Sequence, residues 1–237
     1  MKKNKALLID LDDTLCNYIK TRNHAFKETL HYLNQTIKME EDALFLFTKD
    51  TYEKAKFKAS TISSKHSRII YFQALCEALK IKNILLPLIL EEYFWKMFLK
   101  KIALYQGALQ FLKYAHKKFL ICIISNFTAT FTCKKIHHIN IAPYLDCIVT
   151  SEEVGMEKPN PLIFLYALNK INCLKKNAIM IGNDFINDIQ GADNLNITAI
   201  HITPEEASPQ KKGSTWFNNF SQLKKHLELQ EKSSLIF

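Results

Sequence analysis

Glycine and proline are both scarce in this chain, with 5 glycines and 6 prolines among 237 residues. This scarcity excludes collagen-like and low-complexity chains. A composition of 48% hydrophobic and 23% charged residues also excludes a wholly disordered one. Helices and strands can therefore run uninterrupted. A chain of this length can bury a sizeable core, either as one large domain or as a core with a smaller insert.

No two of the six cysteines form a CxxC pair, which argues against a zinc site. Because Cys122 lies in the apolar segment 120–124, we expect the cysteines to be small apolar core residues in a reducing compartment. No apolar run approaches the roughly 20 residues of a membrane span. The apolar stretch after the first lysines is also too short for a signal peptide. The sequence predicts a cytoplasmic protein with no membrane partner.

The formal charge is +9, from 32 basic and 23 acidic side chains. Nucleic acid or phosphorylated metabolites would suit such a charge as partners, and so would a lysine-rich solvated surface with no partner. The basic residues are dispersed, and no arginine–glycine tail or aromatic–basic RNA motif accompanies them. The charge therefore does not favour a nucleic-acid partner. The densest basic cluster consists of Lys54, Lys56, Lys58, Lys65 and Arg68.

Hydrophobic periodicity divides the chain into two kinds of segment. Residues 5–9 form the pattern of a short buried strand, whereas apolar residues between 21 and 101 recur at three- and four-residue spacings, which predicts a cluster of amphipathic helices. After Gly107, short apolar strands alternate with helices, which predicts a parallel sheet covered on both faces. The expected strands are residues 120–125, 146–150, 178–182 and 197–202. The expected helices are residues 108–118, a polar segment after 126, one starting at Asn160-Pro161, and residues 187–194 and 219–229.

Polar side chains follow several of these strands at the point where each strand ends. In a parallel sheet such ends meet at one edge, where active sites of α/β proteins lie. Carboxylates gathered there would repel one another unless a cation intervened, and hard oxygen ligands suit Mg²⁺. A carboxylate can attack phosphorus, and a second one can protonate the leaving oxygen and then activate water. The residues at the strand ends are Asp10, Asp12, Thr14, Ser125, Asn126, Lys158, Asn183, Asp184 and Asp188.

In this order, the motifs resemble those of the haloacid dehalogenase-like (HAD) hydrolase superfamily. Residues 9–15 (IDLDDTL) resemble its first motif, residues 124–126 (ISN) its second, residues 155–161 (GMEKPNP) its third and residues 181–192 (IGNDFINDIQGA) its fourth. The segment between the first two motifs resembles the family's helical cap. The resemblance implies a Rossmann-like parallel-sheet α/β core, residues 1–16 and 104–237, with an inserted all-helical cap, residues 17–103.

The resemblance also implies a role for each motif residue. Asp10 is expected to be the nucleophile that forms a phosphoaspartate, and Asp12 the general acid and base. The Mg²⁺ ligands are expected to be Asp10, the backbone carbonyl of Asp12, and Asp184. Asn183 stands where many relatives carry the metal-binding Asp, so it and Asp188 are expected to support the site. The phosphoryl group is expected to be held by Thr14, Ser125, Asn126 and the catalytic Lys158.

The resemblance favours a Mg²⁺-dependent phosphatase that acts on a small phosphorylated metabolite, such as a sugar phosphate, a nucleotide or phosphoglycolate. A phosphomutase or phosphotransferase, a dehalogenase and a non-catalytic binding protein stay open, although the family's dehalogenases lack the carboxylate found here at Asp12. Either a monomer or a homodimer is compatible with the sequence. Cap residues that could meet an anionic substrate are Arg22, His24, Lys54, Lys58, Lys65, His66 and Arg68.

Overall fold

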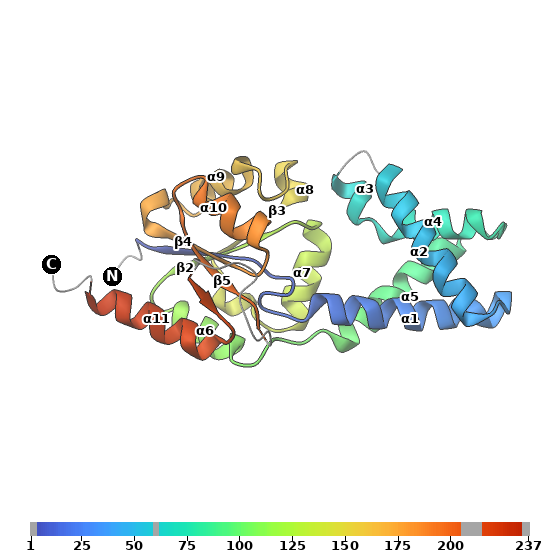
Figure 1. Ribbon diagram of the computed structural model, residues 1–237, viewed down its shortest axis with the longest axis horizontal. Coiled ribbons are helices and arrows are strands. Elements are labelled where there is room, and N and C mark those ends of the chain that lie inside the picture. The colour runs from blue at the N-terminus through green and yellow to red at the C-terminus, as the bar shows by residue number, and fades with distance from the viewer. Residues whose placement is uncertain (1–3, 59–61, 205–214, 234–237) are drawn as a thin grey trace. The chain divides into compact units, whose positions relative to one another are not determined.

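The computed structural model describes residues 4–58, 62–204 and 215–233. The chain divides into two compact units (Figure 1). Residues Met1–Asn17 and Ala103–Phe237 form the first, which we call the α/β unit. Residues Tyr18–Ile102 form the second, which we call the helical unit. The expected domain boundaries, after residues 16 and 103, each lie one residue from these divisions.

A six-stranded sheet runs through the α/β unit, and all of its strand pairs are parallel. This confirms the α/β fold expected from the sequence. The last strand was not expected, because two residues are too few to produce a periodic pattern. In spatial order the strands are β3 (Cys147–Thr150), β2 (Leu120–Ser125), β1 (Ala6–Ile9), β4 (Ala178–Gly182), β5 (Thr198–Ile202) and β6 (Trp216–Phe217).

Helices cover both faces of the sheet. Figure 1 shows α9 (Pro161–Lys170) and α10 (Gly191–Asp193) on one side, and α6 (Ala108–Ala115) and α11 (Phe220–Ser233) on the other. The helix expected over 187–194 begins slightly earlier, as a π-helix at Phe185 that leads into α10. The remaining helices of this unit are α7 (Ala129–His138), η1 (Ala142–Tyr144), α8 (Ser151–Val154), η2 (Lys175–Asn177) and the π-helix η3 (Phe185–Gln190).

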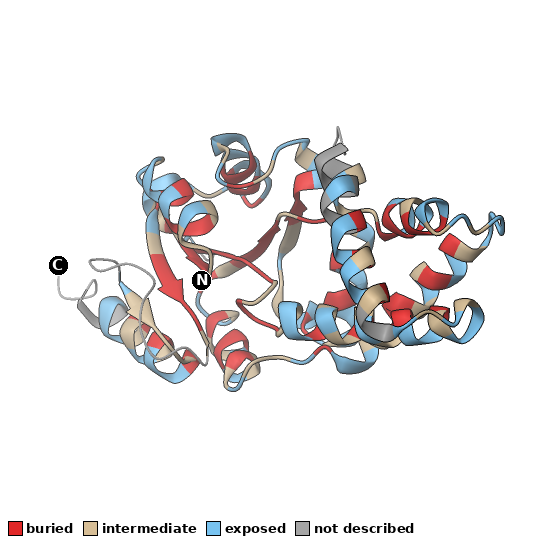
Figure 2. Ribbon diagram, turned by 45° about the vertical axis from the view of Figure 1, so that its right-hand side comes forward, coloured by how far each residue is buried: buried red, intermediate tan, exposed pale blue. Residues whose placement is uncertain are grey.

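The central strand β1 is buried on both faces, as its uninterrupted apolar sequence requires (Figure 2). Ala6 and Leu8 belong to the same core cluster as Ile163 and Phe164 of α9. The start of α9 is fixed by Asn160, whose side chain accepts a hydrogen bond from the Leu162 amide at 2.9 Å. Helix α9 is therefore held in place on one face of the sheet.

The strand order reverses at β1, which is flanked by β2 and β4. Ile9 pairs in register with Ile123 of β2 and with Ile181 of β4. Because the three strands are parallel, the residues that follow them emerge at one edge. The residue after β1 is Asp10, and the one after β4 is Asn183.

The helical unit packs around aromatic side chains. The ring centroid of Phe94 lies 4.8 Å from that of Phe26 and 5.1 Å from that of Trp95, and Phe94 and Phe98 are fully buried. These rings recur at the three- and four-residue spacings that predicted the helices. The unit consists of α1 (Tyr18–Ile37), α2 (Glu41–Lys58), α3 (Ile62–His66), α4 (Arg68–Ala78) and α5 (Leu86–Lys101).

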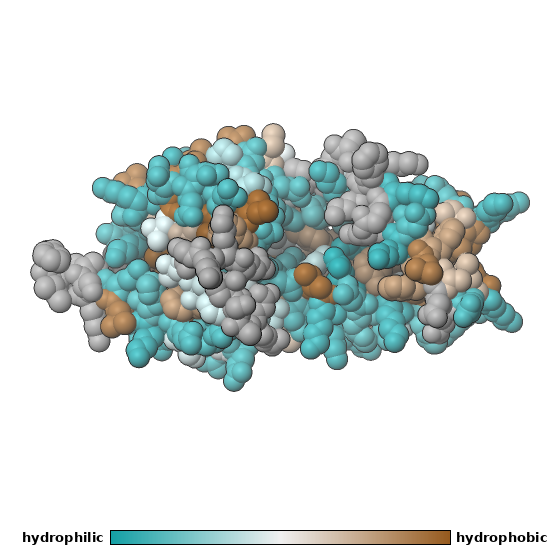
Figure 3. Space-filling model, viewed as in Figure 1, coloured by the Kyte–Doolittle hydropathy of each residue, from teal (hydrophilic) through white to brown (hydrophobic). Residues whose placement is uncertain are grey.

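Figure 3 shows mostly hydrophilic residues on the face in view, as expected for a chain with 23% charged residues. No helix among the described residues is both long and apolar enough to cross a membrane. Cys16, Cys76 and Cys122 are buried as expected. Cys147 and Cys173 are partly buried, and Cys133 is exposed on α7. The prediction that the cysteines are core residues is therefore wrong for Cys133, whose helix carries polar residues around it.

Candidate active site

The first-motif loop begins as a continuation of β1 and then turns sharply. The Asp10 amide donates to the Ile181 carbonyl at 2.9 Å, so Asp10 still lies in line with the sheet. The chain reverses through Asp13, whose φ of 59° is in the left-handed region that Asp tolerates better than most residues. The Asp13 amide then donates to the Cys16 carbonyl at 2.8 Å. This turn brings the side chain of Thr14 back beside Asp10.

The Asp10 carboxylate is held at both of its oxygens. Lys158 Nζ donates to Asp10 Oδ1 at 2.7 Å, and Thr14 Oγ1 donates to Asp10 Oδ2 at 2.8 Å. Asp10 is 7% exposed and Thr14 is fully buried. The carboxylate therefore has one fixed orientation at the carboxyl edge of the sheet, as a nucleophile requires.

Lys158 joins the third motif to the first and the fourth. Its ammonium also donates to Asp188 Oδ1 at 2.6 Å and to the Ile124 carbonyl at 3.0 Å, and the residue is 3% exposed. Burial alone would lower the pKa of Lys158, but the charges of Asp10 and Asp188 and the hydrogen bonds to them raise it above its ordinary value. Lys158 is therefore a buried cation between two carboxylates.

Asn126 makes a two-bond contact with the backbone of Lys158. Its Oδ1 accepts from the Lys158 amide at 2.7 Å, and its Nδ2 donates to the Lys158 carbonyl at 2.9 Å. The side chain expected to hold a phosphoryl group is thus engaged in positioning Lys158. Ser125 is 2% exposed, and its hydroxyl makes no hydrogen bond with the part of the chain described. This hydroxyl is therefore more available than the Asn126 side chain to donate to a phosphoryl oxygen at the end of β2.

Asn183 lies beside Thr14 and thus next to Asp10. The Thr14 hydroxyl, which has one proton, is 2.9 Å from Asn183 Oδ1, and it accepts from the Asn183 amide at 3.1 Å. The Asn183 carbonyl is 2.8 Å from Nε2 of the buried His201. Sequence reasoning missed His201, because a histidine in a buried strand carries no motif signal. Through this contact the His201 ring positions the backbone of the fourth motif.

Asp184 and Asp188 have different surroundings. Asp184 Oδ1 accepts from the amides of Ile186 and Asn187 at 3.0 and 2.9 Å, and its Oδ2 accepts from Asn187 Nδ2 at 2.6 Å, so it caps η3. Asp188 is 1% exposed, and its Oδ2 accepts from the Asp184 amide at 3.0 Å. Burial raises the pKa of Asp188 to about 7, although the nearby Lys158 charge opposes the rise.

Gly182 provides the space that Asp188 occupies, because a Cβ at this position would overlap with Asp188 Oδ2 and Cγ. We expect Gly182→Ala to displace Asp188 from Lys158 and to destabilise the fold by about 1–3 kcal/mol, the usual cost of overpacking. Urea unfolding measures this change. Gly155→Ala is the matched control, because it strains a residue at φ 77° but meets no atom within 4 Å. Because the left-handed backbone at Gly155 costs roughly 1–2 kcal/mol of its own, the position of Asp188 decides. A crystal structure of Gly182→Ala in which Asp188 stays bonded to Lys158 would contradict the steric explanation.

Asp12 has a partner that the sequence did not reveal. Lys135 Nζ of α7 lies 2.6 Å from Asp12 Oδ1 and 2.5 Å from Asp12 Oδ2. Burial raises the pKa of Asp12 above its ordinary value, and the charge and hydrogen bond of Lys135 oppose the rise without cancelling it. The sequence indicated a polar helix here, in which a lysine is expected to face solvent. The one available signal was its spacing from the buried Thr132 and Ile136.

The donor atoms suit a hard cation, but they are not all carboxylates. Within the described ranges, no three His, Cys, Asp or Glu side chains are grouped as metal ligands. An ion such as Mg²⁺ would need the Asp10 carboxylate, a backbone carbonyl such as that of Asp12, and either the Asn183 amide or the Asp184 carboxylate. These are oxygen donors of the kind Mg²⁺ prefers, and that ion also keeps several waters. The residues present therefore fit magnesium.

The basic residues expected to meet a substrate have varied surroundings in the helical unit. Lys54 is exposed and pairs with Asp50 at 2.6 Å, whereas the Lys58 side chain lies outside the described residues. Arg68 is 3% exposed and donates to the Tyr18 hydroxyl at 3.0 Å, so it belongs to the aromatic core. The other basic residues named from the sequence are at least partly exposed, namely Arg22, His24, Lys65 and His66.

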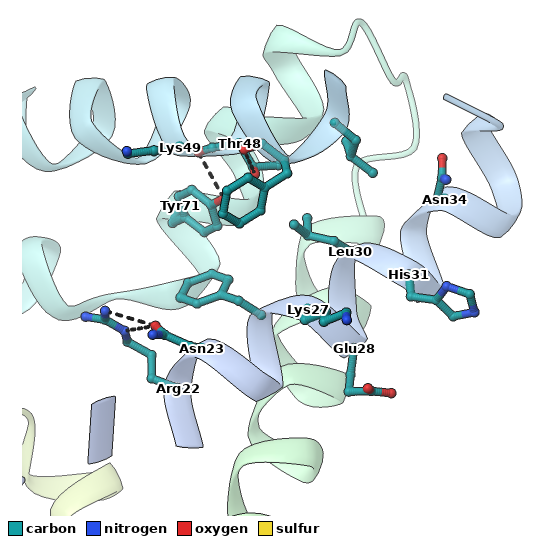
Figure 4. Close-up of a pocket in the computed structure, with 13 residues that line it drawn as sticks. Arg22, Asn23, Lys27, Glu28, Leu30, His31, Asn34, Thr48, Lys49 and Tyr71 are labelled. Carbon is teal, nitrogen blue, oxygen red and sulfur yellow. Dashed lines mark hydrogen bonds between the residues drawn. The ribbon is translucent and has the colours of Figure 1, made fainter. Parts of the chain in front are cut away.

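A cavity of about 910 Å³ lies within the helical unit between α1, α2 and α4 (Figure 4). Arg22, Lys27 and His31 line it from α1, and Lys49 lines it from α2. Arg22 is engaged with Asn23 Oδ1, at 3.3 Å from Nε and 3.1 Å from Nη2. The lining thus combines cationic groups with apolar ones.

Comparisons with known proteins give phosphatases among the relatives by sequence, and a phosphatase as well as haloacid dehalogenases among the solved structures of similar fold. Over 211 residues the chain is 26% identical to a ribulose-1,5-bisphosphate 5-phosphatase of Halopiger xanaduensis, covering 86% of each protein. Over 89 residues it is 38% identical to a glyceraldehyde 3-phosphate phosphatase of Methanothermobacter thermautotrophicus, covering 38% of this chain and 39% of that one. A HAD phosphatase from Thermococcus onnurineus has the same fold, with a TM-score of 0.73, 17% identity, and coverage of 94% and 97%.

The family model that matches the chain is that of the haloacid dehalogenase-like hydrolases, over residues 7–202. The matched range begins in β1 and ends with β5, so it contains all four motifs whose side chains meet at the edge of the sheet. The chain therefore belongs to the haloacid dehalogenase-like hydrolase family.

Proposed function

We propose that this chain is a Mg²⁺-dependent phosphatase that hydrolyses a small phosphorylated metabolite through a phosphoaspartate at Asp10. One observation carries the proposal: the Asp10 carboxylate is fixed by Lys158 and Thr14 at a strand end, with a second carboxylate, Asp12, two residues away. A buried cation on one oxygen and a hydroxyl on the other hold this carboxylate in the attacking orientation.

The first half of the reaction transfers the phosphoryl group to the protein. An Asp10 oxygen attacks phosphorus, and the bond between phosphorus and the ester oxygen breaks. The leaving oxygen takes a proton from Asp12. Lys158 and the Ser125 hydroxyl neutralise charge on the phosphoryl oxygens, which is where a phosphoryl transition state gathers charge.

The second half returns Asp10 to its starting state. Asp12, now a carboxylate, accepts a proton from a water molecule as that water attacks the phosphorus of the phosphoaspartate. The bond between phosphorus and the Asp10 oxygen breaks, and inorganic phosphate leaves. Each proton lost by Asp12 in the first half is therefore regained in the second, so the cycle balances.

Bound magnesium would supply positive charge against the phosphoryl oxygens and reduce the repulsion between the phosphate and Asp10. Asp10 and the Asp12 carbonyl are the proposed ligands from the first motif. For the fourth motif the sequence favoured Asp184, and that expectation stays a prediction. The side-chain placement favours Asn183, since its Oδ1 lies at Thr14 whereas Asp184 is engaged in capping η3.

A magnesium titration of the full-length protein decides between the two residues. We expect Asn183→Ala to weaken Mg²⁺ binding by roughly tenfold or more, the scale seen when groups around a metal are removed. Asp184→Asn should have a smaller effect, because Asn is also a good helix cap and keeps η3 in place. Isothermal titration calorimetry measures both affinities. A larger loss in Asp184→Asn would restore Asp184 as the direct ligand.

The relatives named for their substrates act on small phosphorylated metabolites, among them a sugar bisphosphate and a triose phosphate. We therefore propose a substrate of this class. The test is phosphate release from a panel of sugar phosphates, nucleotides and phosphoglycolate, with and without Mg²⁺. Release on no member of the panel, nor on an aryl phosphate, would reject the proposal. Transfer of phosphate to a sugar instead of water would indicate a mutase, and chloride release from a haloacid a dehalogenase.

Asp12 should matter most for substrates with poor leaving groups. We expect Asp12→Asn to slow turnover of an alkyl phosphate by about 10²–10⁴-fold, the usual contribution of acid–base catalysis. An aryl phosphate has a leaving group that needs less protonation, so its first step should be slowed less. Single-turnover measurements on the two substrates separate these effects. Equal rates for variant and wild type on both substrates would show that Asp12 is not the acid and base.

A further inference from the structure

Lys135 is a lysine with no exposed surface, and it belongs to none of the four motifs. It lies in α7, 123 residues from Asp12 in sequence, and its ammonium contacts both Asp12 oxygens at 2.6 and 2.5 Å. A contact to both oxygens fixes the plane of a carboxylate as well as its position. The helix thus determines how the Asp12 side chain is oriented.

The surroundings of the ammonium keep it away from solvent. Its Nζ lies 4.4 Å from the centroid of the Phe127 ring, and Phe127 is 3% exposed. The Asp12 side chain is 19% exposed, whereas the Lys135 side chain is 0% exposed. The Asp12 carboxylate is therefore partly accessible to solvent, whereas the Lys135 ammonium is not. Lys135 can act on a reacting group only through Asp12.

Stability alone gives a poor explanation for a lysine at this place. Removing an ammonium from water costs several kcal/mol, and an apolar residue of similar volume is often as stabilising as a buried ion pair. A role in the chemistry of Asp12 explains the charge better. Asp12 needs one orientation to reach first the leaving oxygen and then the water.

We infer that Lys135 is a positioning residue that holds the Asp12 carboxylate in its productive orientation through contacts to both oxygens. The inference rests on the proposed function, because Asp12 acts there as acid and base. Loss of the ammonium frees the Asp12 side chain to adopt other orientations. Turnover then falls while substrate binding, which depends on other residues, stays the same.

A double-mutant cycle separates this role from a structural one. The variants are Lys135→Met, Asp12→Asn and the double variant, all in the full-length protein with Mg²⁺ and both an alkyl and an aryl phosphate. We expect Lys135→Met to lower kcat on the alkyl substrate roughly 10–100-fold, part of what acid–base catalysis contributes. KM should be unchanged and the aryl substrate less affected. In the Asp12→Asn background the same substitution should change kcat by less than about twofold.

The same loss in both backgrounds would overturn the inference, as would a change confined to KM. Lys134→Met is the matched control, because Lys134 is adjacent to Lys135 on α7 but is exposed.

If Lys135→Met does not fold, Lys135→Gln is the second variant, because it keeps an N–H donor group and removes the charge. We expect that variant to show the same leaving-group pattern with a smaller loss, and wild-type kcat on the alkyl phosphate would overturn the inference.

The two proposals fail in different ways. An active wild type whose Lys135 variants match it leaves the phosphatase proposal standing and rejects the role of Lys135. A wild type that releases no phosphate from any substrate rejects the proposed function and the inference with it.

Discussion

Asp10→Asn is expected to abolish turnover, with a loss of roughly 10⁴-fold or more, as for the removal of other catalytic nucleophiles. An amide nitrogen or oxygen is too weak a nucleophile to form the covalent intermediate. The substitution preserves the volume of the side chain, and the amide oxygen can still accept from Lys158 or Thr14. The measurement is single-turnover phosphate release, together with a search for phosphorylated protein by mass spectrometry. Wild type should show the adduct and the variant should not.

Asp13→Asn is the matched control for that experiment. It makes the same chemical change three residues along the same loop, at a φ of 59° that Asn also tolerates. Its rate should stay close to that of wild type. If Asp10→Asn kept substantial activity, or if the two variants lost activity equally, Asp10 would not be the nucleophile.

Much of the α/β unit could be predicted from the sequence because its strands are short, apolar and buried on both faces. Residues 120–125 and 178–182 were predicted to be strands with the bounds that the structure shows. The sequence could not predict β6, which has two residues. It predicted a short helix leading through α10, but it could not show that the first part is a π-helix, because π- and α-helices have similar side-chain spacing over six residues.

The motif residues meet as a parallel sheet requires, because Asp10 and Lys158 come from two separate loops and Asp188 from η3, and the three share hydrogen bonds. Two features of the site depend on side-chain contacts that the spacing of residues along the sequence does not indicate. Asn126 was expected to bind phosphate, but its amide bonds the backbone of Lys158. Lys135 was not predicted at all, because a lysine in a polar helix is usually solvated, and its burial depends on where Asp12 lies in the folded chain.

The Lys158 ammonium donates hydrogen bonds to both Asp10 and Asp188, so its removal should lower both the stability of the fold and the rate of turnover. Lys158→Met keeps most of the side-chain volume but leaves Asp10 and Asp188 as buried carboxylates without their shared cation. Breaking a buried ion pair from one side typically costs about 3–5 kcal/mol. We expect a loss of this size in the free energy of unfolding by urea, and a fall in turnover of roughly 10²-fold or more because the phosphoryl oxygens lose a positive charge.

The pH dependence of the Lys158→Met deficit tests its electrostatic origin. Burial already raises the pKa of Asp188 to about 7 with the lysine present, and removing the lysine raises it further. A carboxyl whose folded-state pKa is raised stabilises the fold in its protonated form, and that contribution is lost as pH rises through the folded-state value. The deficit relative to wild type should therefore be smaller at pH 5 than at pH 8.

Lys224→Met provides the control for this comparison. Lys224 pairs with Glu228 at 3.7 Å, and both side chains are 42% exposed, so a loss of at most about 1 kcal/mol is expected. A large Lys158→Met deficit that does not change with pH would show that the loss does not arise from the charge of Asp188. A deficit as small as that of the control would mean that solvent reaches the two carboxylates and compensates them. Lys158 would then be dispensable for the fold, and its effect on turnover would have to come from its contact with the phosphoryl group alone.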